Sequence, residues 1–206
     1  NRWIEKIIVK LLDYSINVGI DFRSITKSIK IKTSVNLYEQ LNPTIKINTK
    51  HGELSFSCLG DIPLWRAENL LTKEPETIEW INDFDDNSVF WDIGANVGVY
   101  SLYAALNDTI KIYAFEPAAT NFHILNENIT NNSFHNQIHA LNIAFNNKRE
   151  MNYLYMSDSK AGSAHHAFGE ARDELGKTFN ESFSQSVLGH RIDDFIIDDS
   201  NSVVTK

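Results

Sequence analysis

The sequence predicts an α/β fold in which parallel strands alternate with helices in a doubly wound sheet. Two short apolar runs, Val89–Ile93 and Ile110–Phe115, have the composition of strands buried on both faces of a parallel sheet. A helical pattern follows each run, and a polar connection from Asp83 to Ser88 precedes the first. Such alternation is typical of open α/β sheets, which bind ligands outside the carboxyl ends of their strands.

A glycine turn joins the first predicted strand to its helix. Gly94 and Gly98 bracket this turn, and glycine permits positive φ and a close approach of a ligand to the backbone. The helix is predicted from apolar residues at helical spacing, namely Val99, Leu102, Tyr103 and Leu106. Its first backbone N–H groups have no partner within the helix, so we expect them to face whatever occupies the turn.

The second predicted strand ends in a carboxylate. Glu116 directly follows Phe115, and it lies eighteen positions after Gly98. That offset is close to the one at which an acidic residue accepts hydrogen bonds from ribose hydroxyls. The glycine turn and Glu116 together predict a pocket for a nucleoside-bearing cofactor.

The spacing of the turn argues against a dinucleotide. It reads Asp92-x-Gly94-x-Asn96-x-Gly98 and not G-x-G-x-x-G. A pyrophosphate requires glycine backbone and a helix N-terminus with no anion nearby, and Asp92 would repel it. A cationic group such as an amino-acid ammonium suits Asp92 instead. A ligand with ribose at one end and an ammonium at the other suggests S-adenosylmethionine.

In these motifs the chain resembles the FkbM-type S-adenosylmethionine-dependent methyltransferases. The resemblance covers roughly residues 62 to 206, and its specificity lies in the combination of motifs, since DIGAN alone would indicate only a class I methyltransferase. The matching segments are FWDIGANVGVYS (90–101), YAFEPAATNFHILNENI (113–129), LNIAF (141–145), RIDDFI (191–196) and, before the first strand, KEPETIEWI (73–81).

The resemblance implies a Rossmann-like class I methyltransferase sheet and methyl transfer from S-adenosylmethionine to a hydroxyl. The acceptor would be a small molecule, either a sugar or a natural product. The implied cofactor contacts are Asp92, Gly94, Ala95, Asn96, Gly98, Glu116 and Pro117, with the adenine approached by Asn142, Ile143 and Ala144. For the last three residues a core strand followed by a polar turn is an equal alternative.

Candidates for the base that removes the acceptor's proton lie later in the chain. The loop after Met156 contains the only adjacent histidine pair, His165 and His166, and histidine titrates near neutral pH. An inert, exposed loop histidine is the alternative for both. Asp193 is a third candidate, although aspartate near a helical turn is more often a cap. No cysteine or further histidine at ligand spacing indicates a metal site.

Further elements are predicted on both sides of these motifs. Residues 1–84 are expected to form an N-terminal α/β extension, and residues 85–206 the S-adenosylmethionine-binding domain. In the extension we predict a helix over Ile4–Leu12 and a hairpin around Lys50–Gly52. We also predict helices over Pro63–Leu71 and Thr77–Phe84, the second with Trp80 and Ile81 facing inward. Predicted in the domain are a helix over Ala118–Asn128, strands over Ile138–Phe145, Met151–Met156 and Phe183–Leu188, and a polar helix or loop over Gly169–Phe183.

Composition narrows the function classes. The formal net charge is −8 at pH 7, which argues against sequence-independent nucleic-acid binding through a broad basic surface. The chain contains no apolar run of the ~18 residues that a membrane span needs. Cys58 is the only cysteine, so no intrachain disulfide can form and a reducing, cytoplasmic location is expected. The oligomeric state stays open.

Two other functions stay open at this point. An NAD-dependent oxidoreductase would also place ribose hydroxyls on Glu116, but the spacing of Asp92 and Asn96 disfavours it. A catalytically inactive cofactor-binding or scaffolding module would keep the same fold, and its signature would be a filled pocket or no affinity for the cofactor. We also expect the catalytic domain to continue beyond residue 206, because Ser202–Lys206 resembles the start of a strand and the predicted strands supply about half of the resembled family's sheet.

Overall fold

The structure, a computed structural model, describes residues 6, 27–158, 160–164, 166–172 and 175–194. Contacts divide the chain into two compact units, residues 1–42 and 43–206, and each is described by itself. The described part of the first unit consists mainly of helix α2 (Lys27–Leu41), which the sequence patterns did not predict. The helix predicted over Ile4–Leu12 lies outside the described residues apart from Lys6. Within the described ranges, no helix is long and apolar enough to cross a membrane.

The second unit is built around a three-stranded parallel sheet. Its strands are β3 (Val89–Ile93), β4 (Lys111–Phe115) and β5 (Ile138–Leu141), in the order β3-β4-β5. Helix α5 (Val99–Ala104) crosses from β3 to β4, and helix α6 (Ala119–Asn131) crosses from β4 to β5. The predicted alternation of parallel strands and helices is therefore confirmed.

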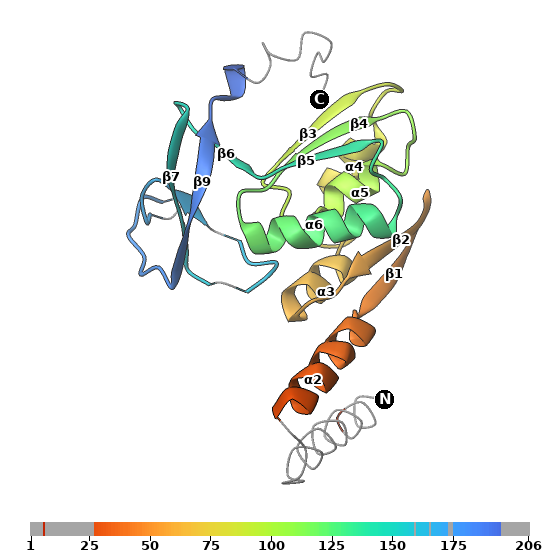
Figure 1. Cartoon of the computed structure of the whole chain (residues 1–206). Coiled ribbons are helices and arrows are strands. Elements are labelled where there is room, and N and C mark those ends of the chain that lie inside the picture. Colours follow the sequence, from red (N-terminus) through yellow and green to blue (C-terminus); the bar gives the residue numbers. More distant parts are fainter. Residues whose placement is uncertain (1–5, 7–26, 159, 165, 173–174, 195–206) are drawn as a thin grey trace. The chain divides into compact units, whose positions relative to one another are not determined.

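Both crossover helices lie on the same side of this sheet (Figure 1). Sequential parallel strands joined by right-handed crossovers require this arrangement. The opposite face carries a row of aromatic rings, in which the ring centroid of Tyr113 lies 6.2 Å from that of Trp91 and 5.2 Å from that of His139. The described residues thus show one of the two helical layers of a doubly wound fold.

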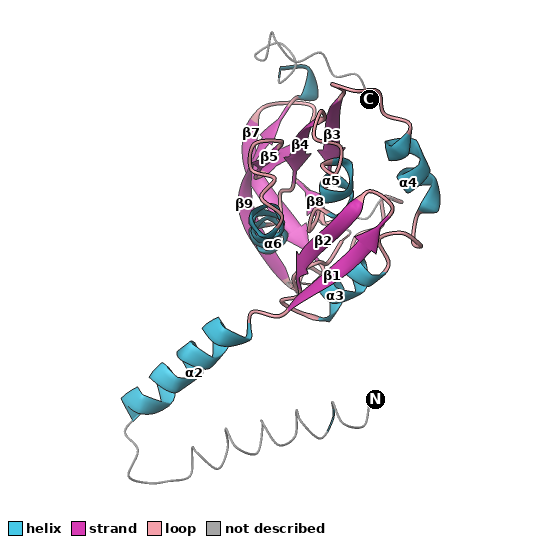
Figure 2. Ribbon diagram, turned by 90° about the vertical axis from the view of Figure 1, so that its right-hand side faces the viewer, coloured by secondary structure: helices cyan, strands magenta, loops and turns pink. Residues whose placement is uncertain are grey.

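A hairpin and two helices precede the sheet and share its hydrophobic core (Figure 2). They are β1 (Thr44–Thr49), β2 (Gly52–Ser57), α3 (Asp61–Glu68) and α4 (Pro75–Asn82). The hairpin and both helices were predicted, the helices two or three residues further along the chain. Their buried side chains include Leu54, Phe56, Ala67, Ile78 and Ile81. The hairpin and both helices thus belong to the same compact unit as the parallel sheet.

The prediction that Trp80 faces inward is wrong. Ile78 and Ile81 form the buried face of α4, whereas Trp80 is 46% exposed. Consecutive helical positions differ by about 100° around the axis, so Trp80 cannot share the direction of Ile81. Its ring lies at the margin of the core instead, packed edge-on against Phe84 and Phe90 with centroid distances of 4.8 and 5.8 Å.

Two asparagines at the C-terminal end of α6 bind the edge of β2 that is not paired with β1. Asn132 accepts a hydrogen bond from Ser55 N (2.8 Å) and donates one to Ser55 O (2.7 Å), as a neighbouring strand would. Asn128 is fully buried, accepts from Ser57 N (2.7 Å) and donates to Val97 O in the glycine turn (2.8 Å). These amides satisfy backbone groups that would otherwise be buried without partners, and they tie the hairpin and the turn to one helix.

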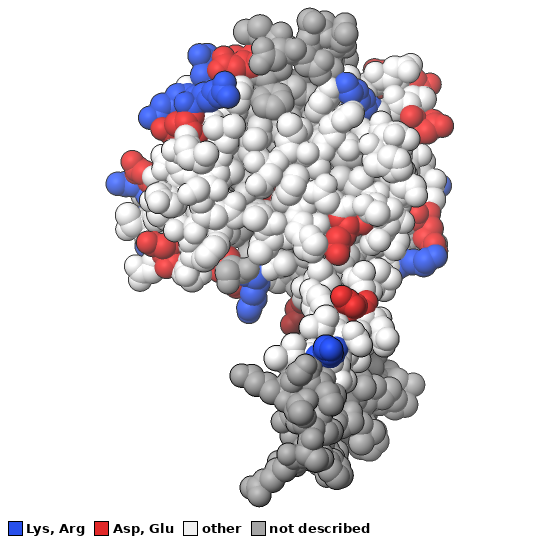
Figure 3. Space-filling view, in the orientation of Figure 1, with Lys and Arg blue, Asp and Glu red and all other residues white. Residues whose placement is uncertain are grey.

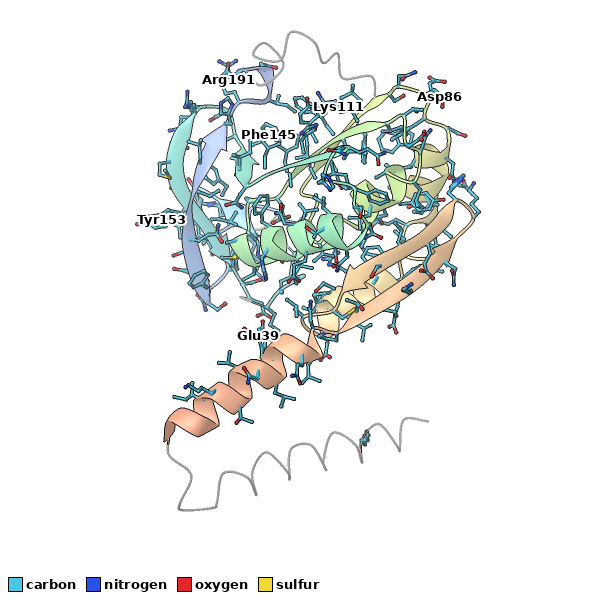
Figure 4. The ribbon with its side chains drawn as sticks, turned by 45° about the vertical axis from the view of Figure 1, so that its right-hand side comes forward. Glu39, Asp86, Lys111, Phe145, Tyr153 and Arg191 are labelled. Carbon is cyan, nitrogen blue, oxygen red and sulfur yellow. The ribbon has the colours of Figure 1, made fainter. Side chains whose placement is uncertain are left out.

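A second, four-stranded sheet begins where the parallel sheet ends. Its strands are β6 (Ile143–Phe145), β7 (Glu150–Met156), β8 (Ala167–Phe168) and β9 (Phe183–His190), in the order β6-β9-β7-β8. One face is buried through Leu154, Met156 and Val187, while Tyr153 points outward from β7 (Figure 4). Phe145, also labelled in Figure 4, connects the two sheets, because its ring lies 4.7 Å from that of Phe115 and stacks on Trp91 at 6.2 Å.

One prediction about this region is corrected and another is narrowed. The third strand, predicted as one run over Ile138–Phe145, is broken at Asn142, and its second half leaves the parallel sheet to pair with β9. Asn142 donates to Glu116 O (2.7 Å) and Pro117 O (2.9 Å), which turns the chain toward the end of β4. Gly169–Phe183 was predicted as a helix or a loop, and its described residues agree with the loop, with an isolated bridge between Arg172 and Thr178.

Candidate functional site

The glycine turn is docked on the carboxyl end of β4. Gly94 N and Ala95 N both donate to Phe115 O, at 2.8 and 3.0 Å. Asn96 has positive φ (54°), a conformation that asparagine tolerates better than most residues. Gly98 adopts the left-handed conformation (φ 83°) immediately before α5, and a Cβ there would lie 2.4 Å from Leu125 Cδ1. The turn is therefore held close to α6, and the sequence needs glycine at position 98.

Asp92 lies at the open end of this turn. Asp92 is partly buried as a residue, and its carboxylate accepts a hydrogen bond from Ser101 Oγ at 2.5 Å. Burial raises the pKa of Asp92 above its ordinary value, and the hydrogen bonds from Ser101 oppose that rise. The next two residues, Ile93 and Gly94, are exposed. The exposed part of the turn therefore begins directly after Asp92.

Glu116 has a different environment, although it follows the neighbouring strand. It is only 4% exposed. Its Oε2 accepts from Asn96 N (2.7 Å), and its Oε1 accepts from Ala118 N (2.8 Å) with a longer contact to Asn121 Nδ2 (3.5 Å). Burial raises the pKa of Glu116, and these hydrogen bonds to the carboxylate oppose the rise. The carboxylate thus binds the glycine turn and the start of α6 from the inside.

A segment from the second sheet covers this carboxylate. Ser163 O accepts hydrogen bonds from Asn96 Nδ2 (2.8 Å) and from Asn121 Nδ2 (3.0 Å). Gly162 N donates to Asn121 Oδ1 (2.7 Å), and Gly162 O accepts from Arg66 Nε (2.7 Å). Asn121 is fully buried and Ser163 is 7% exposed. As the chain is arranged here, ribose hydroxyls cannot reach Glu116.

Arg66 belongs to a cluster of charged groups beside this segment. Burial lowers the pKa of its guanidinium, and the nearby carboxylates of Glu116 and Glu74 act in the opposite direction. Burial and a hydrogen bond to Glu74 raise the pKa of Tyr100, and the charge of Asp92 adds to that rise. Sequence reasoning missed Arg66, Asn121 and Ser163 as parts of this site. Asn121 belongs to the motif segment FEPAATN, and Ser163 lies in the loop that carries His165 and His166, but neither was predicted as a site residue.

The predicted adenine residues lie where the chain leaves the parallel sheet. The Asn142 side chain is engaged by the backbone of Glu116 and Pro117. Pro117 O also accepts from Gln185 Nε2 (2.7 Å), so β9 fixes this turn as well. Ile143 and Ala144 belong to β6, with Ala144 buried in the core of the second sheet.

The described catalytic candidates belong to the region of the second sheet. His166 lines a cavity of about 600 Å³ there, and His165 lies outside the described residues. The cavity is polar, and its other lining residues include Asn146, Lys148, Glu150, Glu170 and Arg172. Asp193 forms an exposed ion pair with Arg191, whose Nη2 lies 3.3 Å from Oδ2. In the ranges the structure describes, no group of three or more His, Cys, Asp or Glu side chains is placed to hold a metal ion.

No protein-family model matches the chain, and no curated protein sequence matches it significantly. Solved structures similar to part of it include a precorrin-6y C5,15-methyltransferase from Geobacter metallireducens GS-15, with 23% identity, 36% of this chain and 41% of that chain covered, and a TM-score of 0.32. A SAM-dependent methyltransferase from Agrobacterium tumefaciens is 15% identical over 50% of this chain and 33% of that chain, with a TM-score of 0.39. A SAM-dependent O-methyltransferase from Thermotoga maritima is 16% identical over 52% of this chain and 43% of that chain, with a TM-score of 0.32.

The aligned part of this chain thus spans less than half of each of these three structures. At such identities and TM-scores the similarities carry no further weight. The fold assignment rests on the observed strand order and on the parallel pairing of β3, β4 and β5.

Proposed function

We propose that the chain is the cofactor-binding part of an S-adenosylmethionine-dependent methyltransferase of the FkbM type. The observation that carries the proposal is the position of Asp92. Asp92, a partly buried residue, lies near the end of β3 and close to the exposed Gly94, in a turn that is docked on the end of β4. In open α/β sheets this edge is the place for a ligand.

The charge of Asp92 selects the kind of cofactor. A pyrophosphate on this turn would lie next to a carboxylate that burial has already made costly to ionise, so a dinucleotide is disfavoured. The ammonium of an amino-acid group would neutralise the same carboxylate with a charge-assisted hydrogen bond. S-adenosylmethionine combines that ammonium with a nucleoside, and it supplies an activated methyl group when bound.

The acceptor in this proposal is a small molecule with a hydroxyl group, on a sugar or a natural product. Methyl transfer requires that the hydroxyl lose its proton, and a side chain that titrates near neutral pH suits that role. We retain His165, His166 and Asp193 as candidates for the base. His166 is supported by its place in the polar cavity, whereas Asp193 is already paired with Arg191.

One face of the described residues supports a small-molecule acceptor. On that face, shown in Figure 3, Lys and Arg side chains lie beside Asp and Glu side chains and form no broad basic patch. Binding of a nucleic acid backbone depends on such a patch.

One observation favours a second candidate, a catalytically inactive module with the same fold. The carboxylate of Glu116 is already bound by protein donors and is covered by Ser163. A module of this kind would keep Glu116 only to stabilise the turn and α6.

Calorimetric titration with S-adenosylhomocysteine and with NAD tests the proposal without a known acceptor. We expect S-adenosylhomocysteine to bind at least tenfold more tightly than NAD, a difference of about 1.4 kcal/mol. Tighter binding of NAD would contradict the methyltransferase. Absence of binding by either ligand, to a chain shown by circular dichroism to be folded, would favour the inactive module.

A further inference from the structure

The segment Ala161–Ser163, called the 161–163 segment below, connects regions that are distant along the chain. It follows β7 in the second sheet, yet its polar contacts are with Asn96 in the glycine turn, Asn121 in α6 and Arg66 in α3. Three elements of the first sheet's layer therefore hold a segment that enters from the second sheet. A segment that only connected β7 to β8 would not require such contacts.

The contacts of this segment are centred on Glu116. Asn96 and Asn121 both contact Glu116, and both also donate to Ser163 O. The carbonyl of Ser163 is therefore bound by the same two asparagines that contact Glu116, the residue predicted to bind the ribose. Because Ser163 and Asn121 are buried there, the segment excludes solvent from Glu116 as well as any ligand.

We propose that the 161–163 segment is a gate on the cofactor site, closed here over Glu116. For a ribose to reach this carboxylate, Ser163 O has to leave Asn96 and Asn121, and Gly162 has to leave Arg66. The open position exposes amide donors of Asn96 and Asn121 together with Glu116, a set that can hydrogen-bond a diol. This inference rests on the proposed function, because it names the ribose of that cofactor as the competing ligand.

Gly162 makes the closed position possible. It has positive φ (81°), and a Cβ at this residue would lie 2.9 Å from Ile62 Cγ2 and 3.0 Å from Pro63 N. The second atom is backbone at the start of α3, so it cannot move aside as a flexible side chain would. Alanine at position 162 therefore disfavours the closed position by steric contact and by backbone conformation.

A segment that opens and a segment that stays in place to shape the site predict opposite effects of Gly162→Ala on binding. If the closed segment competes with the cofactor, the apparent dissociation constant equals the intrinsic constant divided by the fraction of open chains. Straining the closed state raises that fraction and lowers the apparent constant. The variant Gly162→Ala is then expected to bind S-adenosylhomocysteine about 5- to 30-fold more tightly than the parent chain, from the usual cost of left-handed backbone in a non-glycine residue. If the segment instead stays in place and shapes the site, Gly162→Ala should bind S-adenosylhomocysteine more weakly than the parent chain.

The matched control is Gly176→Ala. Gly176 has a similar φ of 76°, but nothing lies within 4 Å of the position of its Cβ. It therefore carries the backbone strain without a contact to the segment. We expect its dissociation constant for S-adenosylhomocysteine to equal that of the parent chain.

Opening is measured separately by thiol labelling. Ser163→Cys in a Cys58→Ser background places a single thiol in the closed segment, where it is buried and should react slowly. We expect Gly162→Ala to speed its labelling, and we expect S-adenosylhomocysteine to speed labelling in the parent background. Arg66→Met removes the hydrogen bond from Arg66 to Gly162 O without adding strain. It should also tighten S-adenosylhomocysteine binding and speed labelling, and it replaces Gly162→Ala if that variant does not fold.

The outcomes separate the gate from the proposed function. Binding of S-adenosylhomocysteine that leaves labelling slow, with no gain in affinity from Gly162→Ala or Arg66→Met, would overturn the gate and leave the cofactor in place. Rapid labelling in the variants without any binding of S-adenosylhomocysteine would overturn the proposed cofactor, and the gate over its site with it.

Discussion

Two carboxylates end neighbouring strands of one sheet, yet one residue is partly exposed and the other is enclosed. Asp92, at the end of β3, is half-buried next to the exposed Gly94. Glu116, just after β4, is bound by Asn96, Ala118 and Asn121 and covered by Ser163. The comparison teaches that a motif defines which groups a ligand could use, whereas the rest of the chain decides which of them a ligand can reach.

The difference has a physical origin in the neighbours of each strand. β3 is an edge strand of the described sheet, so its end has protein on fewer sides. β4 is central, and the turns after β4 and β5 meet there through the bonds of Asn142 and Gln185 to Pro117 O. The 161–163 segment then closes the remaining side through Asn121.

The largest effect is expected where the glycine turn meets α6, on the enclosed side of this comparison. Gly98→Ala forces a Cβ to within 2.4 Å of Leu125 in a left-handed backbone, and should lower the free energy of unfolding by about 4 kcal/mol, from overpacking and strain together. Gly94→Ala, on the partly exposed side, has the same backbone strain but nothing within 4 Å, and should cost only about 1 kcal/mol. Urea denaturation measures the free energy of unfolding of both variants. Equal losses of stability would show that the turn is packed no more tightly at Gly98 than at Gly94.

A second prediction concerns the structural role of Glu116. Glu116→Ala leaves the N–H groups of Asn96 and Ala118 without their acceptor, which should lower the free energy of unfolding by about 3 kcal/mol. Asp92→Asn keeps an oxygen for Ser101 and should change the free energy of unfolding by less than about 1 kcal/mol. The same denaturation experiment compares them. A Glu116→Ala chain as stable as the parent would mean that this carboxylate is not a structural ligand.

A third prediction concerns binding of the cofactor, for which Asp92 rather than Glu116 is the residue tested. Asp92→Asn should weaken S-adenosylhomocysteine binding about 10- to 100-fold, or ~1.4–2.8 kcal/mol, since a charge-assisted bond to the ammonium is lost. Ser101→Ala is the control, because it removes the hydroxyl that Asp92 accepts from and leaves the charge. Calorimetry measures both dissociation constants. If Asp92→Asn binds as the parent does, the ammonium lies elsewhere.

The smallest expected effect is a dependence of that affinity on pH. Burial raises the pKa of Asp92 above its ordinary value of 3.8. As the pH falls through this raised pKa, the carboxylate takes up a proton and loses its attraction for the ammonium. Affinity should therefore decline at a higher pH than an ordinary aspartate would allow, by at most about tenfold per pH unit. In Asp92→Asn the part of the decline that Asp92 causes should vanish, and only the part due to Glu116, whose pKa burial also raises, should remain. Titrations of both chains between about pH 4 and 7 measure the difference, and equal slopes would contradict the role of Asp92.

Local patterns predicted those elements whose residues carry their own signal. The apolar runs of β3 and β4, the helical spacing of α5 and α6, and the turn at Gly52 all appear where the sequence placed them. The break at Asn142 could not be predicted, because Ile138–Phe145 is a continuous strand pattern and the bonds that turn it go to Glu116 and Pro117, distant along the chain.

The candidate site could be predicted only in part for the same reason. The positions of Asp92 and Glu116 at neighbouring strand ends follow from the motifs. The enclosure of Glu116 depends on contacts between Asn96 and Ser163, 67 residues apart, and between Arg66 and Gly162, 96 residues apart. Nothing in the composition of the loop around Gly162 indicates those partners.

A crystal structure of the chain with S-adenosylhomocysteine bound tests the central claim most directly. The account predicts the ammonium of the ligand within hydrogen-bond distance of the Asp92 carboxylate, its ribose at Glu116, and Ser163 O withdrawn from Asn121. A ligand found in the polar cavity between Asn146 and Arg172, or an ammonium remote from Asp92, would contradict it.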